Sequence, residues 1–435
     1  MSAAASHHSV PTIELAIRRY ELSCGATLLV SPRVGAPVFA LHTHVRGGHS
    51  LDPRGKEGLA YLAGALADQG TRLHTEEELS ELLEPAAGSL SGDASGISGQ
   101  IAGRDWRLLC DLACELLTEP TYPEEQYRRQ RERLLERLLV ERDDPRAQGE
   151  LLFRKLVYGE HWLGRNAYGT LDSVRRLRRG EVLAFQREHW VGERTIIAVC
   201  GDVDPEEVRA LFEKRLKRWN RGTPFVPTES RFPERAACTQ VFRADRQQVH
   251  VYLGHLGVAR SDPDYVPLVV MDHVLGTGPG FTNRISMKLR DELGLAYTVH
   301  AAIHSSAGIL PGTFCAYIGT SPQHVTTAIQ GFLAEMQRIR EELVGDDELA
   351  TAKSYLIGSF ALGFQRASRR AGFLISMERH KLPADVLERL PREYAAVTSD
   401  DVRRVARAHL HPDACVLAAA GPTDAKALGR VVSRP

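Results

Sequence analysis

Apolar and polar positions follow two different patterns along the first half of the chain, and each pattern predicts a different element. Short apolar runs at residues 12–33, 37–48 and 194–203 are broken at Gly and Pro, which is typical of β-strands. At residues 104–119 and 124–142 the apolar residues recur every three or four positions, which predicts amphipathic helices. The first half is therefore expected to mix strands with helices.

The second half repeats this order of elements. The predicted strands are 247–258, 296–305 and 312–321, and the predicted helices are 265–276, 283–294 and 322–342. The two halves also end alike: "IIAVCGDVDPEEVRALF" and "CVLAAAGPTDAKALGRV" each predict a strand, a turn and a helix. This repetition indicates two similar domains of the α+β class.

A stretch without hydrophobic periodicity separates the two halves. "NRGTPFVPTESRFPERAACTQ" is rich in Pro and charged residues, which is typical of a linker. We therefore expect an N-terminal domain at 1–220, a linker at 221–240 and a C-terminal domain at 241–435. Domains of about two hundred residues lie within the usual range of sizes.

Composition narrows the classes of partner. Lys and Arg together number 55, as do Asp and Glu, so no overall charge favours nucleic acid or an anionic membrane. No segment approaches the length of a membrane span, and the first twenty residues lack the apolar core of a secretory signal, so a cytoplasmic location is expected. Among seven cysteines, Cys110 and Cys114 lie one helical turn apart without a second thiol pair, which predicts buried thiols and no zinc site.

One segment carries a family pattern. Residues 58–71, "GLAYLAGALADQGT", predict a helix, and with their lead-in they read "VRGGHSLDPRGKEGLAYLAGALADQGT". This sequence resembles the active-site region of the pitrilysin/insulinase-type zinc peptidases, closest to the mitochondrial processing peptidases and their bacterial relatives. "ERDDPRAQ", "CGDVDPEEV" and "LGTGPGFTNRISMKLRDELGLAYTVHA" extend the resemblance over nearly the whole chain. It implies two mostly antiparallel sheets flanked by helices, forming half of a clam-like chamber.

The resemblance also shows what this chain has lost. In that family the motif H-x-x-E-H supplies two zinc-binding histidines and a glutamate that activates water, and a distal glutamate completes the ligand set. Here the motif positions carry Tyr61, Gly64 and Ala65, and the distal position carries Arg137. Gly and Ala offer no side-chain donor atom, and an arginine repels a dication. We therefore expect this motif to hold no metal and no catalytic residue.

Three histidines are the alternative candidates for a metal site. His42 and His44 project from the same face of a predicted strand, and His49 lies near them. A His-x-His pair on a strand can bind a metal, but no third ligand or nearby carboxylate of obvious placement accompanies this pair. Packed or surface histidines are therefore expected.

The second half keeps the family's other functional pair. The motif "LRDELGLAY" contains Arg290 and Tyr297, seven residues apart, and Gly294 is suited to the turn between them. The resemblance implies that the pair holds a backbone carbonyl of the substrate, and both side chains are suitable hydrogen-bond donors. The glycine-rich "LGTGPG", with Gly276, Gly278 and Gly280, matches a loop linked to substrate handling in processing peptidases.

These observations indicate the non-metal subunit of a heterodimeric zinc metalloendopeptidase. Such a chain is inactive alone, needs no cofactor of its own, binds peptide or unfolded protein, and completes the site of a homologous partner that holds zinc. The alternatives are a structural subunit like the core proteins of respiratory complexes, a stand-alone peptide-binding protein, and a homodimeric enzyme with an unrecognised metal site.

Overall fold

Two β-sheets organise the chain in the computed structural model, which describes residues 15–227, 230–279 and 283–432. The first sheet has the order β1-β2-β6-β3-β5-β4, and the second has the order β7-β11-β8-β10-β9. The strands of the first sheet are β1 Arg18–Glu21, β2 Thr27–Pro32, β3 Val38–Val45, β4 Ser89–Asp93, β5 Gly96–Ala102 and β6 Thr195–Gly201. Those of the second sheet are β7 Cys238–Phe242, β8 Val249–Leu256, β9 Val299–Ala302, β10 Thr313–Thr320 and β11 Val416–Ala420.

The second sheet repeats the topology of the first. In the first sheet β2 pairs with β6 in parallel, and the other neighbours are antiparallel. In the second sheet β7 pairs with β11 in parallel, and the remaining neighbours are antiparallel. The order β2-β6-β3-β5-β4 therefore corresponds to β7-β11-β8-β10-β9, and β1 is added to the first sheet alone. The predicted α+β class with two similar, mostly antiparallel sheets is confirmed.

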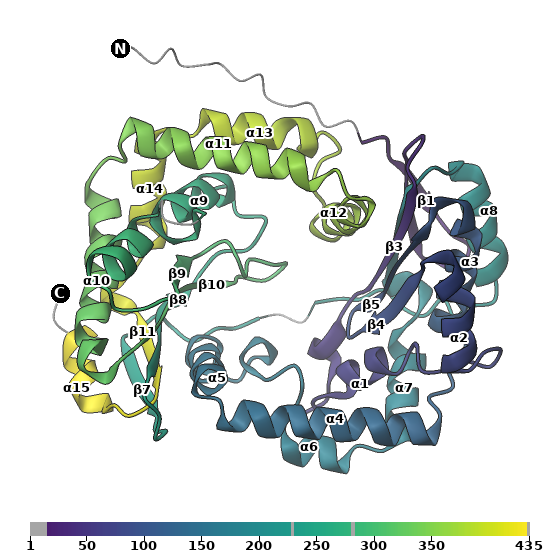
Figure 1. Ribbon diagram of the computed structural model, residues 1–435, viewed down its shortest axis with the longest axis horizontal. Helices are drawn as coiled ribbons and strands as arrows, with labels where there is room; N and C mark the ends of the chain where they lie inside the picture. Colours follow the sequence, from purple (N-terminus) through teal and green to yellow (C-terminus); the bar gives the residue numbers. More distant parts are fainter. Residues whose placement is uncertain (1–14, 228–229, 280–282, 433–435) are drawn as a thin grey trace.

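Helices flank both sheets (Figure 1). In the first half they are α1 Leu59–Ala65, α2 Glu76–Leu83, α3 Trp106–Thr118, α4 Glu124–Asp143, α5 Pro145–Tyr158, α6 Leu171–Arg176, α7 Arg179–His189 and α8 Pro205–Leu216. In the second half they are α9 Tyr265–Asp272, α10 Val325–Glu341, α11 Asp346–Gly363, α12 Ala367–His380, α13 Val386–Ala396, α14 Ser399–His409 and α15 Ala425–Val432. None of the helices in the described ranges is long and apolar enough to cross a membrane.

Each half lends one helix to the sheet of the other half. Helix α5 follows α4 directly in the chain but packs on β8 and β11 of the second sheet. Helix α12, which lies between α11 and α13, packs on β3 and β6 of the first sheet. In Figure 1, α12 lies beside β3, and it also packs against its own half, since the ring centres of Phe373 on α12 and Phe360 on α11 are 6.1 Å apart. This exchange joins the two sheets through two separate contacts.

Small residues let both exchanged helices approach closely. On α12, Ala367 and Ala371 form a buried cluster with Ala40 of β3 and Cys200 of β6. On α5, a Cβ atom at Gly149 would lie 2.9 Å from the ring of Tyr252, so only glycine fits there without movement. Strand β6 is buried along its whole length, because α12 covers one face of its sheet while α3 and α8 pack against the other.

Some predicted boundaries differ from the structure. The helix predicted within 58–71 ends at Ala65 and continues as turns in which Ala67 N–H bonds to the Gly64 carbonyl. Gly70, at φ 130°, leaves helical geometry altogether. Strand β7 begins at Cys238, inside the predicted linker 221–240, and the division into two domains stays a prediction. Cys110 and Cys114 are buried free thiols, as expected.

The exchanged helix α12 provides a test of how the halves are joined. Ala371 is fully buried against the first sheet, so we expect Ala371→Leu to overpack this contact and to cost about 1–3 kcal/mol of unfolding free energy. Gly372→Ala on the same helix is the control, because a Cβ there meets nothing within 4 Å. Urea denaturation measures both. Equal stability of Ala371→Leu and the parent protein would show that the contact is loose.

Candidate functional site

A buried carboxylate fixes the start of helix α1, which corresponds to the zinc-binding helix of the family in the predicted alignment. Asp52 accepts hydrogen bonds from the backbone N–H groups of Gly58 at 2.8 Å and Ala60 at 2.9 Å. Burial raises the pKa of this carboxyl to about 7, against the opposing effect of the two backbone donors. Gly58, at φ 103°, makes the turn into the helix. The lead-in residues therefore position α1 although the motif on it is lost.

The backbone of the β4–β5 turn fills the space beside Gly64. A Cβ atom at Gly64 would lie 2.0 Å from the carbonyl carbon of Asp93 and 2.6 Å from the nitrogen of Ala94. The contact is reciprocal along β4, because a Cβ at Gly92 would lie 2.3 Å from the Gly64 carbonyl oxygen. The position where the family carries its catalytic glutamate thus has no room here for even a methyl group.

An arginine lies next to the other motif positions. The Arg137 guanidinium stacks on Tyr168, with its central carbon 3.6 Å from the ring centre, and Tyr168 meets the ring of Tyr61 edge-on at 5.0 Å. Glu141 accepts from Arg137 Nε at 3.1 Å and from Asn166 at 3.0 Å. A fixed positive charge, two aromatic rings and a sterically closed glycine do not fit a zinc ion. The structure places Arg137 beside Tyr61, as the alignment predicted.

The three candidate histidines, His42 and His44 of β3 and His49 of the 3₁₀ turn Gly48–Leu51, do not form a metal site within the described ranges. No cluster of three metal-ligating side chains there includes His42, His44 or His49. Burial lowers the pKa of His44 to about 4, and the charges of Arg379 and Arg46 add to this effect. Burial likewise lowers the pKa of His49 to about 4. Both imidazoles are neutral at pH 7 and are packed between apolar and basic groups.

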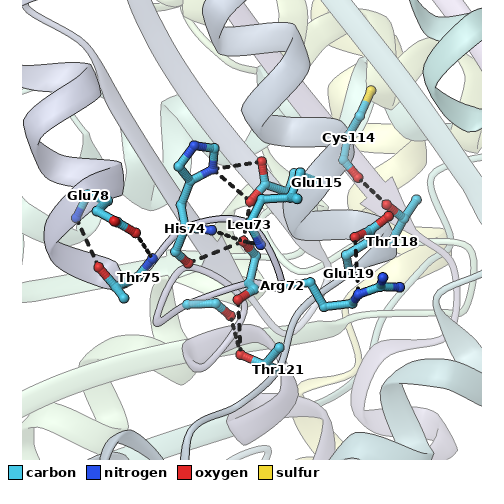
Figure 2. Close-up of polar contacts among 12 residues, drawn as sticks. Arg72, Leu73, His74, Thr75, Glu78, Cys114, Glu115, Thr118, Glu119 and Thr121 are labelled. Carbon is cyan, nitrogen blue, oxygen red and sulfur yellow. Dashed lines mark hydrogen bonds and ion pairs between the residues drawn. The ribbon is translucent and has the colours of Figure 1, made fainter.

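A second buried carboxylate anchors the loop that follows α1 (Figure 2). Glu115 of α3 accepts from the Thr71 hydroxyl and lies 3.0 Å from His74 Nδ1. Thr75 then caps α2 through the backbone N–H of Glu78. These contacts hold the loop in place and leave no side chain of the group directed at a substrate cavity.

The second half of the predicted site lines a large cavity. This first cavity, of about 1100 Å³, lies between α5 and the segment from Gly276 to Ser306. Arg290, Tyr297, Gly276 and Gly278 all line it, so the structure brings together the predicted residues that it describes. Gly280, the fifth predicted residue, lies outside the described ranges.

A helix end positions Arg290 and Tyr297. Arg290 belongs to the π-helical segment η7, Ser286–Glu292, and its Nε donates to Asp291 at 2.9 Å. The segment ends in a wide turn, in which the Leu295 N–H bonds to the Leu289 carbonyl, the Gly294 N–H bonds to the Arg290 carbonyl, and Gly294 adopts φ 61°. Tyr297 follows this turn with 94 % of its surface exposed. The turn at Gly294 is confirmed.

The glycines of the preceding segment have different local roles. Gly276 belongs to the π-helical segment η6, His273–Thr277, and is buried against β9. A Cβ there would lie 2.5 Å from the backbone nitrogen of Ala301, so close packing on the strand requires glycine. Gly278 accepts a hydrogen bond at its carbonyl from Asn283 Nδ2 at 2.9 Å.

Asn283 was missed by the sequence reasoning. Its side chain is buried, and its Oδ1 accepts from Ser286 N–H at 2.8 Å while its Nδ2 donates to Gly278. One amide therefore ties the glycine segment to the start of η7. The neighbouring Arg284, also buried, binds both carboxylate oxygens of Glu348 at 2.8 Å and fixes η7 to α11. The only sequence signal was an asparagine at the first position of the predicted helix 283–294.

Comparison with known proteins agrees with this arrangement. Residues 176–356 match the family model described as Peptidase M16 inactive domain. An uncharacterized zinc protease of Streptomyces coelicolor is 28% identical over 407 residues, which covers 90% of this chain and 86% of that protein. The chain is therefore similar to peptidase M16 proteins, by the family model over residues 176–356 and by this relative over most of its length. The predicted resemblance to zinc peptidases of the pitrilysin/insulinase type is thereby confirmed.

Further similar proteins include one named as a non-peptidase homolog and two solved structures. A Helicobacter pylori protein named a non-peptidase homolog is 24% identical, with 86% of each chain covered. A crystal structure of a peptidase M16 inactive domain from Pseudomonas fluorescens shares the fold at a TM-score of 0.87 and 22% identity, covering 94% of this chain and 99% of that one. A chain of complex III2 from Candida albicans shares it at 0.76 and 15%, covering 96% of this chain and all of that one.

The segment that matches the M16 inactive domain includes Arg290 and Tyr297 and lies outside the degenerate motif at Tyr61, Gly64 and Ala65. The roles of Arg290, Tyr297 and the glycines in binding a substrate stay predictions.

The closed space at Gly64 is directly testable. We expect Gly64→Ala to force α1 away from the β4–β5 turn and to lower the unfolding free energy by about 1–3 kcal/mol. Gly358→Ala, within α11, is the matched control, since a Cβ there meets nothing within 4 Å and alanine favours helices. Chemical denaturation compares the two. A neutral Gly64→Ala would show that the turn yields readily, and that a glutamate could be restored.

The bridge made by Asn283 gives a second test within the M16 site. Asn283→Ala leaves the Gly278 carbonyl and the Ser286 N–H without this partner, so we expect a loss of about 1–3 kcal/mol in stability. Asn283→Asp keeps the acceptor for Ser286 and should lose less. Denaturation curves of the two variants measure the difference, and equal losses would argue against separate contributions from the two hydrogen bonds.

Proposed function

We propose that this M16 homologue is the non-metal subunit of a heterodimeric zinc metallopeptidase. It binds a peptide in the first cavity and presents Arg290 and Tyr297 to a site whose zinc is held by a homologous partner. This chain cannot supply the metal half itself, because Tyr61 replaces a ligand on α1, the β4–β5 turn closes the space beside Gly64, and Arg137 of α4 stands at the distal ligand position.

The exposure of Tyr297 carries the proposal. A tyrosine ring with 94 % of its surface in solvent gains nothing for the stability of its own chain. Tyrosine is enriched at the centres of binding surfaces because it combines a large apolar face with a hydrogen-bonding hydroxyl. At the wall of a cavity, next to an arginine, such a ring is suited to a peptide that arrives from outside.

The shape of the cavity supports an extended ligand. Strand β9 lies at the edge of the second sheet, and Thr298, Val299 and His300 line the cavity. An extended peptide can add to the edge of a sheet through backbone hydrogen bonds, which gives affinity with little dependence on sequence. Helix α5 forms the opposite wall with Arg146, whose guanidinium lies 4.9 Å from the ring centre of Tyr317.

A catalytically inert structural or peptide-binding role is the alternative. The fold shared with a chain of complex III2 from Candida albicans shows that this architecture also occurs as one chain of a larger complex. Under a purely structural role the cavity residues have no task, and their replacement should change no binding. The Helicobacter pylori relative is named a non-peptidase homolog. This name fits a subunit that needs a partner for cleavage as well as an inert homologue, because neither would cleave peptides as an isolated chain.

Peptide binding by the isolated chain tests the first part of the proposal. With a fluorescently labelled, unstructured peptide, we expect Tyr297→Ala to weaken binding about tenfold or more, as at a binding hot spot. Tyr355→Ala is the control, because Tyr355 is also exposed but lies on α11 outside the first cavity. Fluorescence anisotropy measures both variants. Unchanged affinity in Tyr297→Ala would remove the support for this site.

The partner is tested by co-purification from the native source and reconstitution. We expect cleavage of the peptide only when a zinc-binding relative is added, and Arg290→Ala should lower cleavage while the two chains still associate. Zinc-dependent cleavage by this chain alone would contradict the proposal.

A further inference from the structure

A second cavity lies where the two halves meet. Its volume is about 430 Å³, within the range of small-ligand sites. It is lined from the first half by residues around β3 and by Trp162 of the 3₁₀ turn η4, Trp162–Gly164, and from the second half by the loop 306–311 and by α12. Neither sheet forms this cavity without the other.

The lining of the second cavity combines apolar side chains with two arginines. Trp162, Phe225 and Ile309 contribute apolar surface, while Arg46 and Arg379 bring two guanidinium groups. Across the described part of the chain, no Asp or Glu lies within ion-pair distance of either guanidinium; Glu378, adjacent in sequence, pairs with Arg19 at 2.9 Å. Two neighbouring arginines without an acidic partner favour an anion from outside the chain.

One further arginine adds positive charge near this pair. His44 of β3 and His380 of α12 lie close to the two arginines, but the pKa of each is lowered to about 4, so they add no charge at pH 7; Arg260 lies close to His380. Asp93 is the acidic group near His44, and its carboxylate already accepts from the backbone and hydroxyl of Ser95 at 2.7 Å. Partial desolvation and the charge of Arg46 together lower the pKa of Arg379, whose side chain is still exposed to solvent, so the two guanidinium groups repel each other.

The second cavity adjoins the first. Leu163 and Ser306 line both, so a chain lying in the first cavity can continue into the second. An extended peptide advances about 3.3 Å per residue, and a short segment can therefore engage both cavities.

We propose that the second cavity binds the C-terminal end of the peptide, with its free α-carboxylate on Arg46 and Arg379 and an apolar last side chain against Trp162 and Ile309. Arginine binds carboxylates through paired, charge-assisted hydrogen bonds, and the apolar walls favour an organic anion over an inorganic one. This inference rests on the proposed function, because it assumes a peptide in the first cavity.

Two peptides that differ in one group test the proposal. Both carry an N-terminal fluorophore and end in leucine, but one has a free carboxylate and the other an amide. We expect the acid to bind about 10- to 100-fold more tightly than the amide, the range for charge-assisted hydrogen bonds. The difference should vanish in Arg46→Gln and Arg379→Gln and persist in the control Arg369→Gln, on the same helix but outside the cavity.

The outcomes separate this inference from the proposed function. Equal affinity for acid and amide, with both weakened in Tyr297→Ala, would overturn the carboxylate site and leave peptide binding intact. An amide peptide whose affinity is restored by an internal glutamate would also overturn it, because the arginines would then recognise a side chain. Absence of binding for both peptides would overturn both proposals. Thermal unfolding of each arginine variant identifies any loss caused by misfolding.

Discussion

The reciprocal packing of α5 and α12 is the constraint on which the rest of the structure depends. Each helix leaves its own half and covers the sheet of the other, and the close contacts rely on Gly149 of α5 and on Ala367 and Ala371 of α12. Because α5 forms one wall of the first cavity and α12 contributes Arg379 to the second, the exchange that joins the sheets also shapes both cavities. The packing of α5 and α12 therefore contributes both to the stability of the chain and to the shape of its two cavities.

The two halves differ in how accessible their predicted site residues are. On the first sheet, α1 lies so close to the β4–β5 turn that Gly64 tolerates no side chain, and Arg137 provides a positive charge beside Tyr61. On the second sheet, the segment that carries Arg290 is fixed by Asn283 and Arg284, while Tyr297 is left exposed. The position of the metal site is therefore closed, while Tyr297 stays exposed at the wall of the first cavity.

Local patterns were sufficient for most of the elements. The helices α3, α4 and α10 follow from apolar residues at helical spacing, and the matched endings of the two halves predicted the repeated topology. Once the family motif was recognised, the sequence alone showed that Tyr61, Gly64 and Ala65 replace its zinc ligands and its catalytic glutamate. The spacing of Arg290 and Tyr297 also predicted correctly that both residues lie at one cavity.

Features set by distant contacts were not visible in the sequence. Nothing in residues 367–380 shows that this helix packs on the sheet of the other half, because a face of small residues fits either sheet. The steric closure at Gly64 depends on a turn almost thirty residues away in the chain, and a glycine alone does not reveal which backbone approaches it. The bridge made by Asn283 and the meeting of Arg46 with Arg379 depend likewise on tertiary placement.

The central claim is that this chain binds peptide at the first cavity and holds no metal at α1. Hydrogen–deuterium exchange with and without saturating peptide tests this claim most directly. The account predicts slower exchange in the segment 286–302 and in α5 when peptide is bound, with no change in α1, and the same pattern in the presence of a zinc chelator. Protection centred on α1, or protection that disappears when zinc is removed from the isolated chain, would contradict it.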